Sequence, residues 1–252
     1  MQQTLTPAAG TGASAGVASG PPAPALGLSF ETFVDPAFGL EQQERFGEAA
    51  GAAAASLLVW QAPRALVVGR ADARLPGFAG AQAALQEEGW PVLVRRSGGL
   101  AFPITPGTLQ FALVRRAGPG VTLDSMYREL AETILALLGG FGLAGEIGEK
   151  PDAFCPGRYD LLLAGRKVAG LSQHWRMRNG QTMVTCVATL IVDEDAGELA
   201  RIVNRFYETA GGAHRCGPAA VTDMRHLLAA VPPHAGTLVD QLRLRLSERF
   251  PA

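Results

Sequence analysis

Cysteine is scarce in this chain, which has three thiols in 252 residues, at Cys155, Cys186 and Cys216. An odd number of cysteines spaced about thirty residues apart does not form a disulfide framework, and it lacks the close pairs of a structural zinc site. The four histidines also show no spacing typical of metal ligands. We therefore expect free thiols, no metal site and a reducing cytoplasm as the location of the protein.

Charge and long apolar runs are lacking as well. The formal net charge is −1 and 18% of the residues are charged, so no basic field points to nucleic acid. The alanine-rich run at 49–60 is too short to span a bilayer. The first apolar stretch has no basic flank of the kind that precedes a secretory signal. We expect no binding to nucleic acid or membrane.

Charged side chains are absent altogether from residues 1–26, where Gly, Ala, Ser, Thr and Pro dominate. Such a segment buries too little apolar surface to offset the entropy lost on ordering. We therefore expect a disordered tail over 1–26 and one folded domain over 27–252.

The remaining chain combines short apolar runs with amphipathic segments. Helices are expected over 37–55, 79–89, 122–142, 195–209, 221–230 and 235–249. Strands are expected over 56–60, 65–69, 91–97, 108–116 and 143–148, followed by hairpins about Ala164-Gly165 and Asn179-Gly180. Because strands follow one another in hairpins and helices are grouped between and after them, we predict an α+β fold with a largely antiparallel or mixed central sheet flanked by helices.

A glycine-rich turn follows two arginines in RRSGGLAFPITPGTLQF, residues 95–111. Without Cβ atoms, Gly98 and Gly99 let the backbone bend and approach a ligand closely. Exposed amide groups there, together with Arg96, are suited to hold a phosphate, a carbonyl or a pantetheine arm. Taken alone, the stretch is more typical of a loop whose glycines only permit a positive φ.

The sequence CPGRYDLLLAGRKVAG, residues 155–170, places a thiol and a lysine around one hairpin. Most lysines are solvated surface groups, but small residues around Lys167 predict a partly desolvated ammonium that can hold a carbonyl or stabilise a thiolate. In a straight hairpin Cys155 and Lys167 would lie more than about 20 Å apart. They can meet only if Pro156-Gly157 turns the chain back across the sheet.

The three thiols are not equivalent. Cys155 precedes a Pro-Gly break, in a segment too irregular to be the middle of a strand. Cys186 lies inside an apolar run, which is typical of a buried structural residue. Cys216 follows His214 closely and is the rival nucleophile, because a neighbouring histidine can activate a thiol. We favour Cys155.

These motifs together resemble the lipoate branch of the biotin/lipoate protein ligase superfamily. The loop from Arg95 is similar to the branch's Arg-Ser-Gly-Gly-Gly-Ala loop, and GRKVAGLSQ (165–173) to its Gly-x-Lys-Val-Ala-Gly strand. RYDLLL (158–163) and AAVTDMRHLL (219–228) resemble its Asn-Asp-Leu and Val-Thr-Asn-Leu segments. CPGRYDL resembles the cysteine-dependent transferases of the branch, which move octanoyl from the glycine-cleavage H protein to lipoyl domains. The resemblance covers residues 28–250.

The resemblance implies that Cys155 carries an acyl group as a thioester and that Lys167 supports its thiolate. It also implies substrate contacts from Arg96, Ser97, Gly98, Gly99, Leu100, Ala101, Asp160, Val168, Ala169 and Gly170. The implied partners are the H protein or acyl carrier protein and the lipoyl domains of 2-oxoacid dehydrogenases. No cofactor is expected beyond the transferred octanoyl or lipoyl group, and the protein is expected to act as a monomer.

Two departures separate the chain from the ATP-dependent ligases of the branch. Ile104-Thr105 stands where those ligases have His-Asp, and Leu100 stands at the third loop glycine. We also expect the chain to have no additional C-terminal domain of the kind that many ligases carry. These departures favour acyl transfer. The alternatives are an ATP-dependent lipoate-protein ligase and a non-catalytic module that binds lipoyl or carrier domains.

Overall fold

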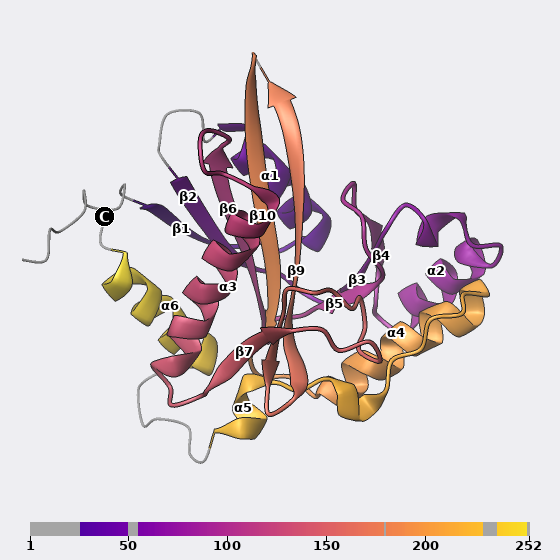
Figure 1. The fold of residues 1–252 in the computed structure, drawn as a ribbon. Helices are drawn as coiled ribbons and strands as arrows, with labels where there is room; N and C mark the ends of the chain where they lie inside the picture. Colours follow the sequence, from indigo (N-terminus) through magenta and orange to yellow (C-terminus); the bar gives the residue numbers. More distant parts are fainter. Residues whose placement is uncertain (1–25, 50–54, 179, 229–235, 251–252) are drawn as a thin grey trace, which may run out of the picture.

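A computed structural model describes residues 26–49, 55–178, 180–228 and 236–250, and its main element is a seven-stranded sheet (Figure 1). The strand order is β1-β2-β6-β10-β9-β8-β7; β1 and β2 pair in parallel, and the other neighbours pair antiparallel. The strands are β1 (Leu26–Thr32), β2 (Ala55–Gln61), β6 (Thr108–Arg116), β7 (Gly145–Gly148), β8 (Asp160–Leu163), β9 (Arg166–Arg178) and β10 (Gln181–Ile191). The prediction of a mixed, largely antiparallel central sheet is confirmed.

A second sheet of three strands lies beside the first. Its order is β4-β3-β5, with β3 parallel to β4 and antiparallel to β5. These strands are β3 (Ala65–Val68), β4 (Val92–Val94) and β5 (Phe102–Ile104). The helices are α1 (Pro36–Ala49), α2 (Phe78–Glu87), α3 (Leu123–Gly139), α4 (Ala196–Ala210), α5 (Met224–Leu227) and α6 (Leu238–Arg249). In Figure 1, α2 and α4 lie together beside the small sheet, away from α3 and α6.

Alternation along β2 divides the core between the two faces of the large sheet. Leu57 and Val59 belong to the cluster that includes the buried stripe of α3, whereas Leu58 and Trp60 pack in the cluster that side chains of α1 join. The predicted stripe is buried at Met126, Leu130, Ile134 and Leu137. Helix α3 starts at a capping box in which Thr122 and Ser125 exchange side-chain hydrogen bonds. The two sides of the sheet are therefore covered by different helices.

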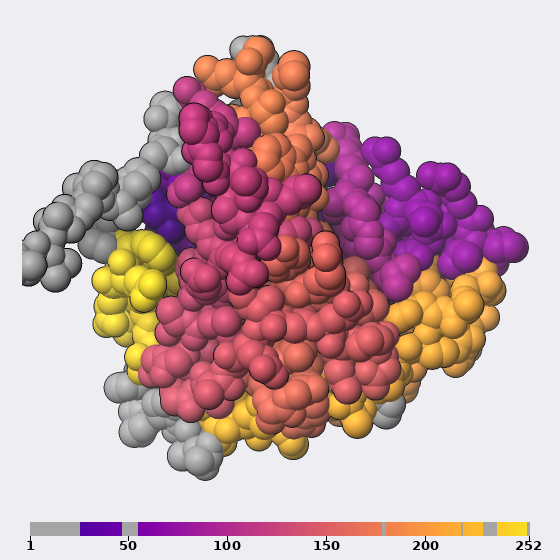
Figure 2. All heavy atoms as spheres, viewed as in Figure 1, coloured from indigo at the N-terminus to yellow at the C-terminus, as the bar shows by residue number. Residues whose placement is uncertain are grey.

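The hairpin turns follow the sequence signals. Ala164 and Gly165 both have positive φ, at 48° and 70°, as a two-residue turn between twisted strands requires. Strands β9 and β10 pair from Arg178 and Gln181 inward, while Asn179 of the second predicted turn lies outside the described residues. The ends of β9 and β10 beside this turn project above the body of the protein in the space-filling view of Figure 2.

Some predicted boundaries are wrong. The helix predicted over 221–230 is reduced to α5, because Val221 forms a parallel bridge with Lys167 and the Thr222 amide donates to the Lys167 carbonyl. The helix predicted over 37–55 ends at 49, and residues 50–54 lie outside the description. Strands β1 and β5 were not predicted. The predicted tail included Leu26, which begins β1; residues 1–25 lie outside the described part. Among the described residues no helix has the length and apolarity needed to cross a membrane.

Candidate active site

The loop between β7 and β8 brings Cys155 to the start of β9. The Gly157 amide donates to Oδ2 of Asp160 at 2.9 Å, and the Asp160 amide donates to the Gly157 carbonyl at 3.0 Å. This turn reverses the chain, so the Cys155 carbonyl oxygen lies 2.6 Å from Nζ of Lys167. Pro156-Gly157 therefore turns the chain back, and it is the main chain of Cys155 that contacts Lys167.

The ammonium of Lys167 is buried among three oxygen acceptors. Nζ donates to the carbonyls of Phe154 and Cys155, at 3.0 and 2.6 Å, and pairs with Oδ2 of Asp160 at 2.8 Å. Both charged side chains are 1% exposed. Burial raises the pKa of Asp160 to about 6, and the nearby ammonium opposes this rise. Lys167 thus fixes the main chain on either side of the thiol.

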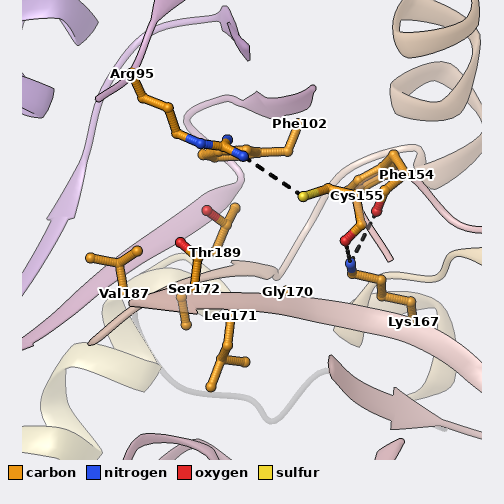
Figure 3. A pocket seen from close by; sticks show the side chains of 11 residues that line it. Arg95, Phe102, Phe154, Cys155, Lys167, Gly170, Leu171, Ser172, Val187 and Thr189 are labelled. Atoms are coloured by element: carbon orange, nitrogen blue, oxygen red, sulfur yellow. Dashed lines mark hydrogen bonds between the residues drawn. The ribbon is translucent and has the colours of Figure 1, made fainter. Parts of the chain in front are cut away.

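Cys155 has a φ of 45°, a left-handed conformation that is uncommon for a residue with a side chain. Its thiol is half-buried. The Leu100 amide donates to Sγ at 3.2 Å, and Nη2 of Arg95 lies 3.8 Å from the same sulfur (Figure 3). The three contacts of Lys167 hold the main chain of Cys155 in this strained conformation, with the sulfur under an amide and beside a guanidinium.

The arginine at the thiol is Arg95, whereas the sequence pointed to Arg96. Arg95 is 8% exposed, and its guanidinium carbon lies 4.7 Å from the centre of the Phe102 ring. Nε and Nη2 hold the Gly98 carbonyl, and Nη2 also holds the Leu100 carbonyl at 2.9 Å. Arg96 points outward and pairs with Glu44 at 3.1 Å. The role of Arg96 as a substrate contact stays a prediction, and the arginine beside the thiol is Arg95.

The glycine loop approaches the thiol closely. Gly99 has a φ of 102°, and a Cβ atom there would clash with Nη2 of Arg95 and lie 3.0 Å from Sγ of Cys155. The Leu100 amide faces the sulfur. The Ala101 amide does not face it, because it donates to the Tyr207 hydroxyl at 2.8 Å. Gly99 therefore permits a close approach as well as a positive φ, whereas a Cβ atom at Gly98 would meet nothing within 4 Å.

Sequence analysis did not predict two residues that hold this loop by hydrogen bonds, Tyr207 and Asp72. The Tyr207 hydroxyl, which accepts from the loop, donates in turn to Asp72 at 3.1 Å. Burial raises the pKa of Tyr207, so the phenol keeps its proton. Both residues come from segments distant in sequence, and neither carries a local motif that would predict the contact.

A narrow cavity of about 40 Å³ is lined in part by Cys155, and it adjoins a wider groove of about 380 Å³. The two share Arg95, Phe102, Ser172 and Val187. The cavity is further lined by Phe154, Cys155, Lys167, Gly170, Leu171, Ala188 and Thr189. Figure 3 shows the guanidinium and Phe102 on one side of this space and the β9 residues on the other.

The other predicted substrate contacts divide between groove and interior. Arg96 and Ser97 line the wider groove. Asp160, Val168 and Ala169 are buried and line neither space, and Asp160 contacts Lys167 instead. Val168 is the extra residue of a β-bulge, because Leu161 pairs with Ala169 while Leu162 pairs with Lys167.

The two other thiols are buried away from solvent. Burial raises the pKa of Cys186, which lies in β10 with no exposed surface. Burial also raises the pKa of Cys216 to about 11, so this rival nucleophile is protonated at neutral pH. Burial lowers the pKa of its neighbour His214. Within the described residues no group of three or more His, Cys, Asp or Glu side chains is placed to hold a metal ion.

Residues 35–247 match the family described as lipoyl protein ligase A/B catalytic domain. An octanoyl-[GcvH]:protein N-octanoyltransferase of Geobacillus kaustophilus is 34% identical over 160 residues, which are 63% of this chain and 55% of that protein. A protein of the same name from Kyrpidia tusciae is 35% identical over a region that covers 68% of this chain and 61% of that protein. A lipoyl-[GcvH]:protein N-lipoyltransferase of Listeria monocytogenes is 32% identical over a region that covers 61% of this chain and 54% of that protein. The chain thus spans little more than half the length of these relatives.

Solved structures share the fold. A lipoate-protein ligase A bound with ATP superposes with a TM-score of 0.63 at 19% identity, over 89% of this chain and 84% of that one. A bi-partite lipoate protein ligase of Thermoplasma acidophilum gives a TM-score of 0.61 at 18% identity. The superposition covers 89% of this chain and 82% of that chain. Since the family match covers most of the described residues and the solved structures share their fold, the chain belongs to the lipoyl protein ligase A/B catalytic domain family.

Proposed function

We propose that this protein transfers an octanoyl or lipoyl group, through a thioester on Cys155, from acyl carrier protein or H protein to the lysine of a lipoyl domain. The observation that carries the proposal is that Cys155 lines a cavity, with its Sγ in contact with the Leu100 amide and the Arg95 guanidinium. Support also comes from relatives named as octanoyl and lipoyl transferases that use GcvH.

The first half-reaction loads the thiol. The Cys155 thiolate attacks the acyl carbonyl carbon, a C–S bond forms, and the carbonyl electron pair moves onto oxygen. Collapse of this oxyanion re-forms the carbonyl and expels the leaving group of the donor. An amide donor leaves as an amine that takes a proton from water, and a thioester donor leaves as a thiolate. The Arg95 guanidinium lies 3.8 Å from the sulfur, and the thiolate is the nucleophilic form of a cysteine.

The second half-reaction unloads it. The neutral amine of the acceptor lysine attacks the thioester, a C–N bond forms, and the C–S bond breaks to return the thiolate. The lysine nitrogen releases one proton to water. With an amide donor this balances the proton that the leaving amine takes up; with a thioester donor it accompanies the release of the donor's thiolate. Because one acyl bond replaces another, the cycle consumes no nucleotide.

The cavity sets where the acyl chain lies. A space of about 40 Å³ admits three or four groups the size of water, at about 10–15 Å³ each. An eight-carbon chain therefore extends past the cavity into the groove, along the shared residues Phe102 and Val187. Each buried CH₂ contributes about 0.8 kcal/mol to binding.

The test is the intact mass of the protein after incubation with octanoylated H protein. We expect the wild type and Cys216→Ala to gain one octanoyl group each, and Cys155→Ala to gain none. Transfer to a lipoyl domain that persists in Cys155→Ala with free lipoate and ATP would identify a ligase instead. Binding of the H protein without any adduct or turnover would identify a non-catalytic module.

A further inference from the structure

We propose that Arg95 is a catalytic residue of this acyl transfer, whose Nη1 donates a hydrogen bond to the acyl carbonyl oxygen as that oxygen becomes anionic. The inference rests on the proposed function and deepens it. The family resemblance placed the important cation on Lys167, whereas the contacts of the two cations place the guanidinium at the reacting atoms.

The ammonium of Lys167 has no donor left for a substrate. A lysine side chain carries three N–H donors. Those of Lys167 are matched by the carbonyls of Phe154 and Cys155 and by the Asp160 carboxylate. A new bond to an oxyanion would break a bond to one of these buried partners. Lys167 therefore acts as a positioning residue for the loop of Cys155.

Arg95 has donors to spare. Its guanidinium carries five N–H groups. Nε and Nη2 are directed to the Gly98 and Leu100 carbonyls, which fix the side chain in the loop. Nη1 is buried and, within the described part of the chain, has no hydrogen-bond partner. A buried donor without a partner is rare in native proteins, and a ligand oxygen in the adjoining cavity would satisfy it.

The guanidinium is also fixed in the place where the oxyanion forms. Arg95 lines the narrow cavity, its plane lies against Phe102, and Nη2 is 3.8 Å from the sulfur. Figure 3 shows the guanidinium facing the thiol across this space. Nη1 shares its carbon with Nη2, which lies 3.8 Å from Sγ, so a carbonyl carbon bonded to Sγ places its oxygen near the guanidinium and the Leu100 amide. The amide that now contacts the thiol can turn to this oxygen once the sulfur has lost its charge.

Both half-reactions pass through the same oxyanion, so loss of Arg95 should slow loading and unloading together. The amount is set by the usual effect of one oxyanion donor, which is about 100-fold to 1,000-fold in rate. Arg95→Lys keeps the positive charge and removes the fork of donors. Arg95→Gln removes both.

The experiment compares two reactions of the same sulfur. The first is acylation of Cys155 by an octanoyl-pantetheine thioester, which passes through an oxyanion. The second is alkylation by iodoacetamide, which requires the thiolate but forms no oxyanion. We expect both Arg95 variants to acylate about 100-fold more slowly than the wild type, while their alkylation slows less than about 10-fold. Arg201→Gln removes a charge from the exposed side of α4 and should change neither rate.

Equal losses in the two reactions would overturn the inference, because Arg95 would then only order the loop or support the thiolate. Unchanged acylation in Arg95→Gln would overturn it as well. If Arg95→Gln does not fold, the ratio measured for Arg95→Lys decides between these outcomes. A wild-type protein that is alkylated but never acylated would refute the proposed function itself, which is a separate result.

Discussion

Replacing Lys167 by methionine should destabilise the protein strongly, because the ammonium joins a buried carboxylate to two buried carbonyls. Asp160 and Lys167 are each 1% exposed and lie 2.8 Å apart. Methionine keeps the apolar stem, so the change isolates the loss of charge and hydrogen bonds. Among the residues that the structure describes, the Asp160 carboxylate would then keep one hydrogen-bond donor, the Gly157 amide. Breaking a buried ion pair by removing one partner costs about 3–5 kcal/mol, and we expect the free energy of unfolding to fall by this amount.

The measurement is urea denaturation followed by tryptophan fluorescence at pH 7.5, with the double variant Lys167→Met/Asp160→Asn alongside both single variants. The asparagine still accepts from the Gly157 amide but carries no charge. The double variant should therefore lose less stability than the sum of the single variants, by about 1–3 kcal/mol. The exposed pair of Arg201 and Glu198 is the control, and its removal should cost less than about 1 kcal/mol.

Two results would refute this reasoning. A loss below about 1 kcal/mol in Lys167→Met would mean that the ammonium does not hold the loop in solution. Strict additivity of the two single changes would mean that the carboxylate and the ammonium do not interact. With either result, something other than the hydrogen bond from Lys167 to the Cys155 carbonyl would have to hold Cys155 in its conformation.

Gly99→Ala adds a methyl group 3.0 Å from the reactive sulfur, and we expect the rate of octanoylation to fall about 100-fold. The control is Gly80→Ala, whose methyl group would meet no atom within 4 Å and should leave this rate unchanged. Gly170→Ala adds a methyl group 2.9 Å from Nζ of Lys167, so the free energy of unfolding should fall by about 1–3 kcal/mol, and an unchanged urea midpoint would contradict the contact. Burial raises the pKa of Asp160 above 3.8 to about 6, so the folded protein binds this proton more tightly than the unfolded chain. The stabilisation from that bound proton is present below about pH 4 and is lost as the pH rises through about 6. Relative to Asp160→Asn, the wild type should thus lose up to about 3 kcal/mol of stability across this window, and a gain would contradict the sign.

Local signals were sufficient for much of the fold. The stripe of α3 and the turn at Ala164-Gly165 depend on neighbours in sequence, and both appear as predicted. Strand β1 is held by its parallel pairing with β2, across an intervening helix, so no local pattern predicts it. Residues after 220 have helical character, yet Val221 and Thr222 contact Lys167 through the backbone. Long-range pairing therefore decided the elements that sequence analysis missed.

In the candidate site, too, local sequence predicts which residues take part, and long-range pairing decides where their side chains point. The sequence placed a thiol, a lysine and an arginine pair in one motif set, but the roles of the two cations depend on where their donors point. Arg95 and Arg96 are consecutive, so their side chains leave the chain in different directions, and one of them reaches the sulfur. The choice follows from the continuation of β4 along β3, where the Arg95 amide donates to the Val68 carbonyl at 2.9 Å. The motif thus supplies a cation for the thiol, and the pairing of two strands distant in sequence selects which arginine provides it.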